Sequence, residues 1–233
     1  MSQEEHDRRI ENRRRRVMPA GSKSILVTKR TLEQGLEFLA AKDSDLASVI
    51  EAHGPPPIWG RPAGFATLVR IILEQQVSLA SAKAAFDRLE DQLGTVEPKL
   101  FLTLDDPTLK RIGFSRQKAG YCRELAASIV EGRFELEALG KMSDEAAREE
   151  LMSLKGVGRW TADIYLLMVL SRADVWPSGD LALAKAAQEV KGLAVTPSPD
   201  VLEKVGSKWR PWRAVAARLL WHHYLSRPRA ATN

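Results

Sequence analysis

The sequence predicts an all-α fold, and three observations carry this prediction. The chain has 233 residues, 44% of them hydrophobic, which is enough to bury a core in one large domain or in two small lobes that share a groove. Apolar residues recur at helical spacing in short segments separated by glycine and proline, as at Phe65, Leu68, Val69 and Ile72. No convincing run of alternating apolar residues is flanked by hairpin turns, so a sheet is not expected.

The first 30 residues are predicted to form a flexible basic arm. From Asn12 to Arg30 the chain has no acidic residue and few large apolar side chains. Such an arm could bind a polyanion through counterion release, and a solvated tail is an equally good alternative. Thr31 and Gln34 have the spacing of a capping box, so Thr31 is expected to cap the first helix and the folded domain to span residues 31–233.

The rest of the chain brings the predicted total to about ten helices. An extended linker at Gly54–Pro57 is expected to precede the helix that contains Phe65, which runs into Gln75–Ser78. Further helices are predicted at about 82–93, 107–112, 116–131, 144–154, 159–171, 181–190, 199–206 and 211–225. The last should open with Pro211, because the first turn is where a missing amide costs least.

Charge and cysteine content bound the function. A net charge of +5 and a pI near 9.4 favour an anionic partner without requiring one. Cys122 is the single cysteine, which excludes an internal disulfide, a four-cysteine iron–sulfur cluster and a cysteine zinc cage. No apolar run reaches the roughly 18 residues of a membrane span and the N-terminus has no apolar signal core, so a cytoplasmic protein is expected.

Several polar residues are expected to play ordinary structural roles. His222 and His223 lack further ligands at usable spacing, so no metal site is predicted there. Asp105 precedes Pro107 by two residues and should cap a helix. Asp163 and Glu74 are expected to be surface charges.

The most informative segment is residues 151–162, Leu-Met-Ser-Leu-Lys-Gly-Val-Gly-Arg-Trp-Thr-Ala. One apolar helix ends at Leu154, a turn with two glycines follows, and a second apolar helix begins at once. Gly156 and Gly158 allow a tight turn whose backbone amides can approach a phosphate, and the positive end of the second helix points the same way. Lys155 and Arg159 flank that spot. A simple connection between two packed helices is the structural alternative.

In these residues the sequence resembles the helix-hairpin-helix (HhH-GPD) DNA glycosylase superfamily, whose hairpin has the pattern L-x-G-V-G-x-x-T-A followed by a later Gly-Asp. Leu154–Ala162 and Gly179-Asp180 match this pattern. The resemblance extends to Ile72–Ser78, to Gly113–Ala119 and to Lys208–Arg213, and the combination is similar to the 3-methyladenine DNA glycosylase II branch. It implies a two-lobed all-α fold with a DNA groove between the lobes and the hairpin at about 154–160.

The resemblance assigns the catalytic carboxylate to Asp180. By itself an Asp before Leu181 is an ordinary helix N-cap. In the family this Asp faces the sugar of the flipped nucleotide, where a carboxylate can stabilise the oxocarbenium-like cation that forms as the glycosidic bond breaks. An ion pair at about 4 Å with an effective dielectric near 20 is worth about 4 kcal/mol, or roughly three decades of rate. Whether Asp180 also activates the attacking water stays open.

The base pocket implied by the resemblance contains two tryptophans, Trp160 and Trp221. Trp160 stands where bifunctional relatives carry the lysine that forms a Schiff base, so no lyase step is expected. An alkylated purine is cationic, and an indole face attracts cations by roughly 0.5–2 kcal/mol. A tryptophan on an amphipathic helix is more often part of the core than a ligand platform, so core and pocket are equally good alternatives for Trp160 and Trp221. Trp209 and Trp212 are weaker candidates. Ile164 stands where some relatives have a pocket tyrosine.

Other family positions imply contacts with DNA. Gln75 and Gln76 approach the lesion gap or pocket, and Ser78 is as well explained by an exposed helix end. Ser115 and Arg116 lie in the loop that matches the wedge loop, where one or the other stands in place of a relative's apolar tip residue. The predicted DNA-binding residues are Lys155, Gly156, Val157, Gly158, Arg159, Thr161, Ser115 and Arg116.

Taken together, these residues predict a monomeric, monofunctional glycosylase that hydrolyses alkylated purines, of the 3-methyladenine or 7-methylguanine type, from double-stranded DNA during base excision repair. One alternative keeps the fold and acts on another lesion, such as ethenoadenine or hypoxanthine. The other alternative is a non-catalytic DNA-binding module that uses only the hairpin. No metal and no cofactor are expected, apart from a structural monovalent cation that hairpin carbonyls of relatives can hold.

Overall fold

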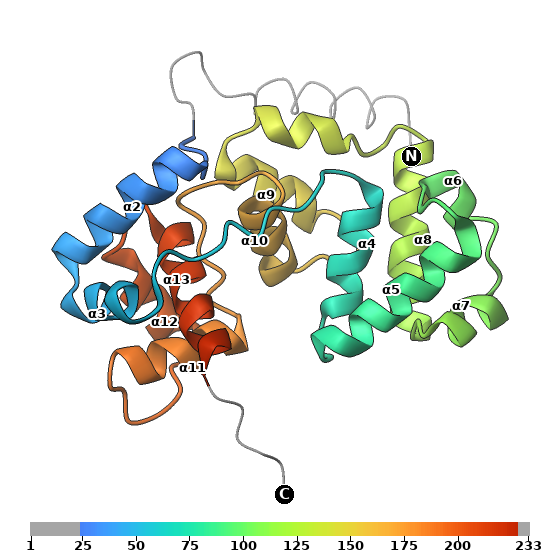
Figure 1. The fold of residues 1–233 in the computed structure, drawn as a ribbon. Coiled ribbons are helices and arrows are strands. Elements are labelled where there is room, and N and C mark those ends of the chain that lie inside the picture. The colour runs from blue at the N-terminus through green and yellow to red at the C-terminus, as the bar shows by residue number, and fades with distance from the viewer. Residues whose placement is uncertain (1–23, 228–233) are drawn as a thin grey trace, which may run out of the picture. The chain divides into compact units, whose positions relative to one another are not determined.

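The computed structural model describes residues 24–227, and these are almost entirely helical (Figure 1). Over this range there is no strand, and Leu26 and Arg172 form an isolated antiparallel bridge. None of the described helices has the length and apolar character needed to cross a membrane. The chain divides into two compact units. One contains Arg61–Tyr165, and the other combines Ile25–Gly60 with the segment that starts at Leu166.

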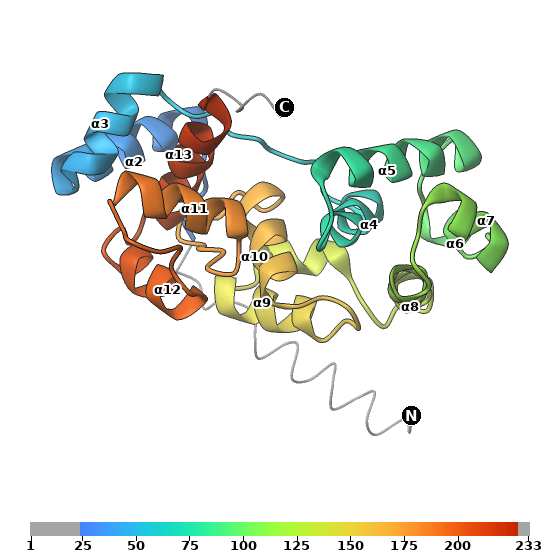
Figure 2. The same ribbon diagram turned by 90° about the horizontal axis from the view of Figure 1, so that it is seen from below.

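The first unit begins with helix α4 (Phe65–Glu74), whose expected apolar face is buried. Its other helices are α5 (Leu79–Leu93), α6 (Pro98–Phe101), α7 (Asp106–Ile112), α8 (Arg116–Val130), the 3-10 helix η1 (Leu136–Lys141), α9 (Asp144–Met152) and the first part of α10 (Arg159–Met168). Helix α4 packs on α5 and α8, and α8 also packs on α6 and α7 (Figure 2). Side chains cap α5, α7, α8 and α9, through Ser78, Asp105, Ser115 and Ser143.

The second unit is built around helix α13 (Arg213–Ser226), which packs on each of the unit's other helices. These are α2 (Lys29–Lys42), α3 (Ser44–His53), α11 (Leu181–Val190) and α12 (Pro199–Ser207). The run from Arg213 to Trp221 is buried at every position. Because helices of its own unit surround α13, its sequence lacks the usual polar face.

Arg218 is a buried cation in this second unit. Its guanidinium donates to the backbone oxygens of Ile58 at 2.7 Å, Leu167 at 2.7 Å and Ala214 at 3.1 Å. Burial lowers the pKa of this guanidinium to about 10. The side chain therefore ties the linker before the first unit to the core helix α13.

The start of the first described helix differs from the prediction. Thr28, not Thr31, is the N-cap of α2: its hydroxyl accepts from the Thr31 amide at 3.2 Å, and the Thr31 hydroxyl accepts from the Thr28 amide at 2.7 Å. Thr31 is thus the third helical residue of the capping box, whose side chain bonds back to the N-cap amide. Val27 is buried and bonds to the Ser171 carbonyl, so the backbone is already anchored before the helix. Residues 1–23 of the predicted basic arm lie outside the described residues.

The sequence also missed elements that depend on packing. Helices α3, α6 and η1 were not predicted, and α5 begins at Leu79, earlier than expected. The last helix begins at Arg213, so the prediction that Pro211 opens it is wrong. The Trp212 amide bonds to the Trp209 carbonyl at 2.8 Å, which places Pro211 in a turn before the helix.

Candidate functional site: the hairpin and the Asp180 carboxylate

The predicted hairpin lies between α9 and α10 in the first unit. Its turn closes where the Val157 amide donates to the Leu154 carbonyl at 3.1 Å. The side chains of Leu154 and Val157 are buried, whereas Lys155, Gly158 and Arg159 are exposed. Apolar anchors thus hold the turn in the fold, and its cationic side chains and the start of α10 face solvent, an arrangement suited to an anion.

The two glycines of the hairpin differ in backbone conformation and in the space around them. Gly156 has φ +85°, and a Cβ at this position would overlap the ring of Tyr121. Gly158 has an ordinary φ, and a Cβ there would meet nothing within 4 Å. The fold therefore requires glycine at position 156. At Gly158 the space beside the backbone is open, so a ligand can approach it closely.

The side chain of Gln75 stabilises this turn through hydrogen bonds. Its Nε2 donates to the Gly156 carbonyl at 2.9 Å and to the Thr161 hydroxyl at 2.8 Å, and Thr161 itself is buried. The next residue, Gln76, is exposed and has φ +56°, a backbone conformation that side chains other than glycine adopt at a cost. The glutamine pair therefore lies at the hairpin, with one member holding it and the other at the surface.

The remaining predicted residues of the first unit divide by exposure. Trp160 is half-buried and Ile164 is buried. Ser115 caps α8 by accepting from the Lys118 amide at 3.2 Å, and Arg116 is exposed beside it.

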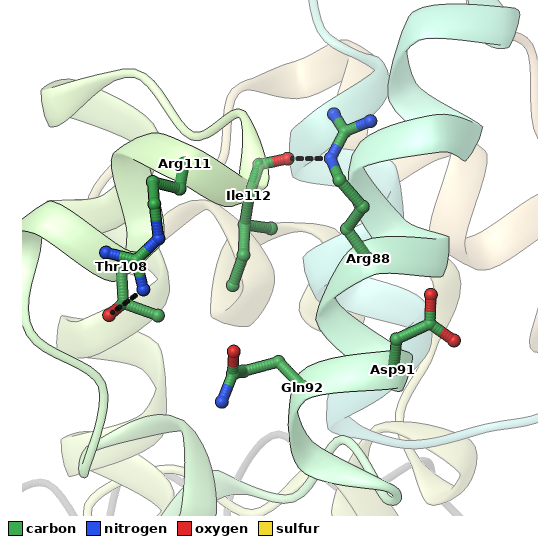
Figure 3. Close-up of a pocket in the computed structure, with 6 residues that line it drawn as sticks. All are labelled: Arg88, Asp91, Gln92, Thr108, Arg111 and Ile112. Atoms are coloured by element: carbon green, nitrogen blue, oxygen red, sulfur yellow. Dashed lines mark hydrogen bonds between the residues drawn. The ribbon is translucent and has the colours of Figure 1, made fainter.

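A cavity of about 280 Å³ between α5 and α7 contains none of the predicted site residues (Figure 3). It is lined by Arg88, Asp91, Gln92, Thr108, Arg111 and Ile112.

Two carboxylates expected at the surface are covered: Asp163 is a buried residue, and Glu74 is partly buried with a side chain that is 7% exposed. Asp163 is 1% exposed and accepts from Arg148 Nε at 2.7 Å, with Arg159 Nε at 3.6 Å from its other oxygen. Burial is the largest single effect and disfavours the cation, but the charge and hydrogen bond of Asp163, together with the charges of Glu145 and Asp144, outweigh it and raise the pKa of Arg148. Glu74 receives two hydrogen bonds from Arg61, at 2.9 and 3.0 Å. Because Asp163 also pairs with Arg159, it helps to hold this first residue of α10 at the hairpin.

One sequence signal could have revealed the buried Asp163. Its neighbours on both sides, Ala162 and Ile164–Leu167, are apolar, so this part of the helix has little room for a solvated face. Arg159 stands four residues earlier, at the spacing of an ion pair. Arg148, the stronger partner, lies on another helix and could not be assigned by spacing.

Asp180 is in the second unit, as the N-cap of α11. Its amide bonds to the Pro177 carbonyl at 2.9 Å, which closes the turn before the helix. Its Oδ1 accepts from the Leu183 amide at 2.7 Å and from Trp221 Nε1 at 3.1 Å. Trp221 comes from α13 and is 8% exposed, while Asp180 is partly exposed. The carboxylate is therefore held by a helix terminus and by an indole from the core helix.

Two other tryptophans of this unit, Trp176 and Trp209, are part of its core. Trp209 is buried and donates to Asp43 Oδ2 at 2.9 Å, and Trp176 donates to the Leu202 carbonyl at 3.0 Å. These contacts agree with the expectation that Trp209 is a weak candidate for the pocket. Trp212 is half-buried, next to Gly35.

The histidine pair has partners in the second unit. His223 Nδ1 lies 3.2 Å from His53 Nε2, and His222 Nε2 lies 3.0 Å from the His53 carbonyl oxygen. Burial, and then His53, lower the pKa of His223. In the part of the chain that the structure describes, no group of three or more His, Cys, Asp or Glu residues could hold a metal ion.

The hairpin carbonyls keep capacity for the predicted monovalent cation. The carbonyl of Leu154 accepts one backbone amide at 3.1 Å, that of Gly158 accepts another at 3.0 Å, and that of Gly156 accepts Gln75. A carbonyl oxygen has two lone pairs and can accept a second contact. Carbonyl oxygens are the ligands that the predicted cation would take, and the cation itself stays a prediction.

Replacing Trp221 by phenylalanine is expected to remove the indole donor from Asp180 while retaining most of the buried ring. A hydrogen bond to a charged group contributes about 1.5–3 kcal/mol, and Asp180 keeps its bond to Leu183, so the lower end of that range is expected. Any Asp180-dependent reaction should therefore slow by about tenfold. Single-turnover rates measure this, with Trp176→Phe, which removes an indole donor from the Leu202 carbonyl in the same unit, as the control. An unchanged rate would contradict a positioning role for the indole.

Comparisons with known proteins find a matching family model and several relatives. The family model of the HhH-GPD superfamily base excision DNA repair protein matches residues 69–211. The alkylbase DNA glycosidase-like protein of Schizosaccharomyces pombe is 29% identical over 192 residues, which cover 79% of this chain and 90% of the relative. DNA-3-methyladenine glycosylase 1 of the same yeast is 27% identical over 180 residues, covering 76% and 79%.

A solved structure gives the same result. The crystal structure of the DNA-3-methyladenine glycosidase from Bacillus halodurans matches with a TM-score of 0.69 and 29% identity, over 82% of this chain and 89% of that one. The matched family model includes the hairpin and Asp180, and both have the local geometry described above. The chain therefore belongs to the HhH-GPD superfamily of base excision DNA repair proteins.

Proposed function

We propose that this chain is a monofunctional DNA glycosylase that hydrolyses the N-glycosidic bond of alkylated purines in double-stranded DNA. The observation that carries the proposal is the Asp180 carboxylate, held at the N-terminus of α11 by the Leu183 amide and the Trp221 indole. Relatives named as 3-methyladenine glycosylases support the choice of substrate class. We further propose that the protein acts as a monomer in the cytoplasm.

The chemistry follows from the charge that develops on the sugar. As the bond between C1′ and the base nitrogen breaks, its electron pair goes to the base and positive charge builds on the sugar ring. A fixed carboxylate lowers the energy of that cation without any reorganisation. Water then adds to C1′ and loses a proton. An N-alkylated purine is cationic and leaves as a neutral base, so a general acid is not needed.

Binding of the DNA backbone is assigned to the hairpin. The exposed side chains of Lys155 and Arg159, the start of α10 and the open space at Gly158 together favour a phosphate. Asp163 holds Arg159 from the buried side. Trp160, half-buried in the first turn of α10, offers an indole face to a cationic base.

The absence of a lyase step is part of the proposal, because Trp160 replaces the lysine that bifunctional relatives use. The protein is therefore expected to leave the abasic strand intact and to form no borohydride-trapped adduct with it. A denaturing gel of end-labelled duplex after base release tests this, with alkali as the positive control for strand breakage. Strand cleavage without alkali, together with a trapped adduct, would contradict the monofunctional assignment.

The experiment that tests the function is release of free bases from methylated duplex DNA, resolved by chromatography. The purified protein is expected to liberate methylated purines and to leave unmodified duplex intact. If no methylated base is released, the same assay with ethenoadenine or hypoxanthine duplexes tests for a different lesion. Binding without release from any of these duplexes would identify the chain as a DNA-binding module and contradict the proposal.

A further inference from the structure

Lys118, which the sequence analysis assigned to no site, holds the end of helix α4. Its Nζ donates to the carbonyl of Leu73 at 2.7 Å and to the carbonyl of Gln75 at 2.8 Å. These carbonyls belong to the last turn of α4, where backbone acceptors lack helical donors and a cation is favourable. The side chain is half-buried, and burial lowers its pKa. Lys118 therefore fixes the backbone of Gln75.

Gln75 is consequently held at both its backbone and its side chain. The backbone carbonyl is bonded to Lys118, and the side-chain Nε2 is bonded to the Gly156 carbonyl and the Thr161 hydroxyl. The following residue, Gln76, turns to φ +56°. A conformation of this kind persists only where neighbouring contacts determine it, and the bonds to Gln75 supply them.

Helix α8 also contacts the hairpin directly. Tyr121, three residues after Lys118 and therefore on the same face of α8, packs against Gly156 so closely that a Cβ on the glycine would overlap the ring. Its hydroxyl accepts from Gln117 Nε2 at 2.6 Å. One face of α8 thus supports the hairpin in two ways. The Tyr121 ring packs on Gly156 directly, and Lys118 is hydrogen-bonded to Gln75, which is itself hydrogen-bonded to Gly156.

We propose that Lys118 is a positioning residue for the hairpin and acts on it through Gln75. The hydrogen bonds of its Nζ go to the carbonyls of Leu73 and Gln75, so its effect on the hairpin passes through the amide of Gln75. That the hairpin binds DNA rests on the proposed function, whereas the mechanical coupling from Lys118 to the hairpin does not.

The coupling is tested first by hydrogen exchange in the protein alone. Lys118→Met keeps the chain length of the side chain and removes its donors and charge. The amides of Val157 and Ala162, which donate to the Leu154 and Gly158 carbonyls, are expected to exchange about tenfold faster in this variant, as for a loss of about 1.4 kcal/mol of local stability. Lys99→Met, an exposed lysine on α6 of the same unit, is the control and should leave them unchanged. Unaltered exchange at Val157 and Ala162 in a folded Lys118→Met protein would overturn the proposal.

A double-mutant cycle separates action through Gln75 from a general loss of stability. Lys118→Met, Gln75→Leu and the double variant are compared for affinity toward a duplex with a stable abasic-site analogue, at one fixed salt concentration. Each single variant is expected to bind about tenfold more weakly. The double variant should also lose about tenfold, because both changes break the same series of contacts. A loss near a hundredfold, the sum of two independent effects, would overturn the proposal.

The two proposals fail in different ways. If the wild type releases no base from any lesion, the proposed function fails, and the exchange experiment still decides the role of Lys118. If the wild type releases methylated purines and Lys118→Met matches it in both exchange and affinity, the glycosylase function stands and the positioning role is wrong.

Discussion

Replacing Asp180 by asparagine is expected to slow base release in single turnover by about a hundredfold or more, which corresponds to at least about 2.7 kcal/mol of transition-state stabilisation. The reason is the loss of a negative charge opposite the developing sugar cation. A full ion pair at about 4 Å is worth about 4 kcal/mol at an effective dielectric near 20, and the neutral amide retains only its dipole.

The geometry around Asp180 makes this substitution a clean test. Asparagine also caps helices well, and its side-chain oxygen can still accept from the Leu183 amide and from Trp221 Nε1. The fold and the DNA affinity should therefore be nearly unchanged, and the effect should appear in the rate.

Asp105→Asn provides the matched control. Asp105 is also an N-cap aspartate, and it accepts from the Thr108 amide at 2.9 Å at the start of α7. The control variant is expected to release base at the wild-type rate. If Asp180→Asn and Asp105→Asn are equally active, Asp180 is only a helix cap and the assignment of the catalytic carboxylate is wrong.

Replacing Gly156 by alanine is expected to destabilise the first unit by about 2–5 kcal/mol. The residue has φ +85°, where a Cβ costs roughly 1–2 kcal/mol, and the added methyl overlaps the Tyr121 ring, which costs about 1–3 kcal/mol more. The Gly156 carbonyl would also move relative to Gln75 Nε2, its hydrogen-bond donor. Urea denaturation followed by far-UV circular dichroism measures the loss.

Gly158→Ala is the comparison, because it makes the same chemical change two residues away. A Cβ at Gly158 meets nothing within 4 Å and the backbone needs no positive φ, so stability should change by less than about 1 kcal/mol. Affinity for duplex DNA should nevertheless fall, because the methyl occupies space that a phosphate would use. Equal destabilisation by the two substitutions would contradict the distinction between a glycine required by the fold and one that faces outward.

Much of the secondary structure was accessible from the sequence because it depends on local rules. The spacing of Phe65, Leu68, Val69 and Ile72 predicted α4, and all four side chains are buried. Helix α11 has the bounds that were expected, 181–190. Asp105 is the cap that its position before Pro107 predicted. In each case the deciding interaction lies within one or two turns of the chain.

The wrong predictions share a different physical origin. Thr31 and Thr28 are both adequate caps, and the choice depended on residues 25–27 pairing with a segment near residue 172. Asp163 and Glu74 are charged and were expected in water, yet each meets an arginine that permits burial. Long-range partners decide such cases, because a buried charge is tolerated only where one is present.

By itself, the sequence determined the helical class, the position of the hairpin and the presence of Asp180 after Gly179, because each depends on residues close together in the chain. The tertiary structure alone decided that Trp221 donates to Asp180, that Gln75 braces Gly156, and that Lys118 fixes Gln75. These contacts join residues 41, 81 and 43 positions apart. Periodicity and propensity act over a few residues, so only packing of the helices could bring such groups within hydrogen-bonding distance.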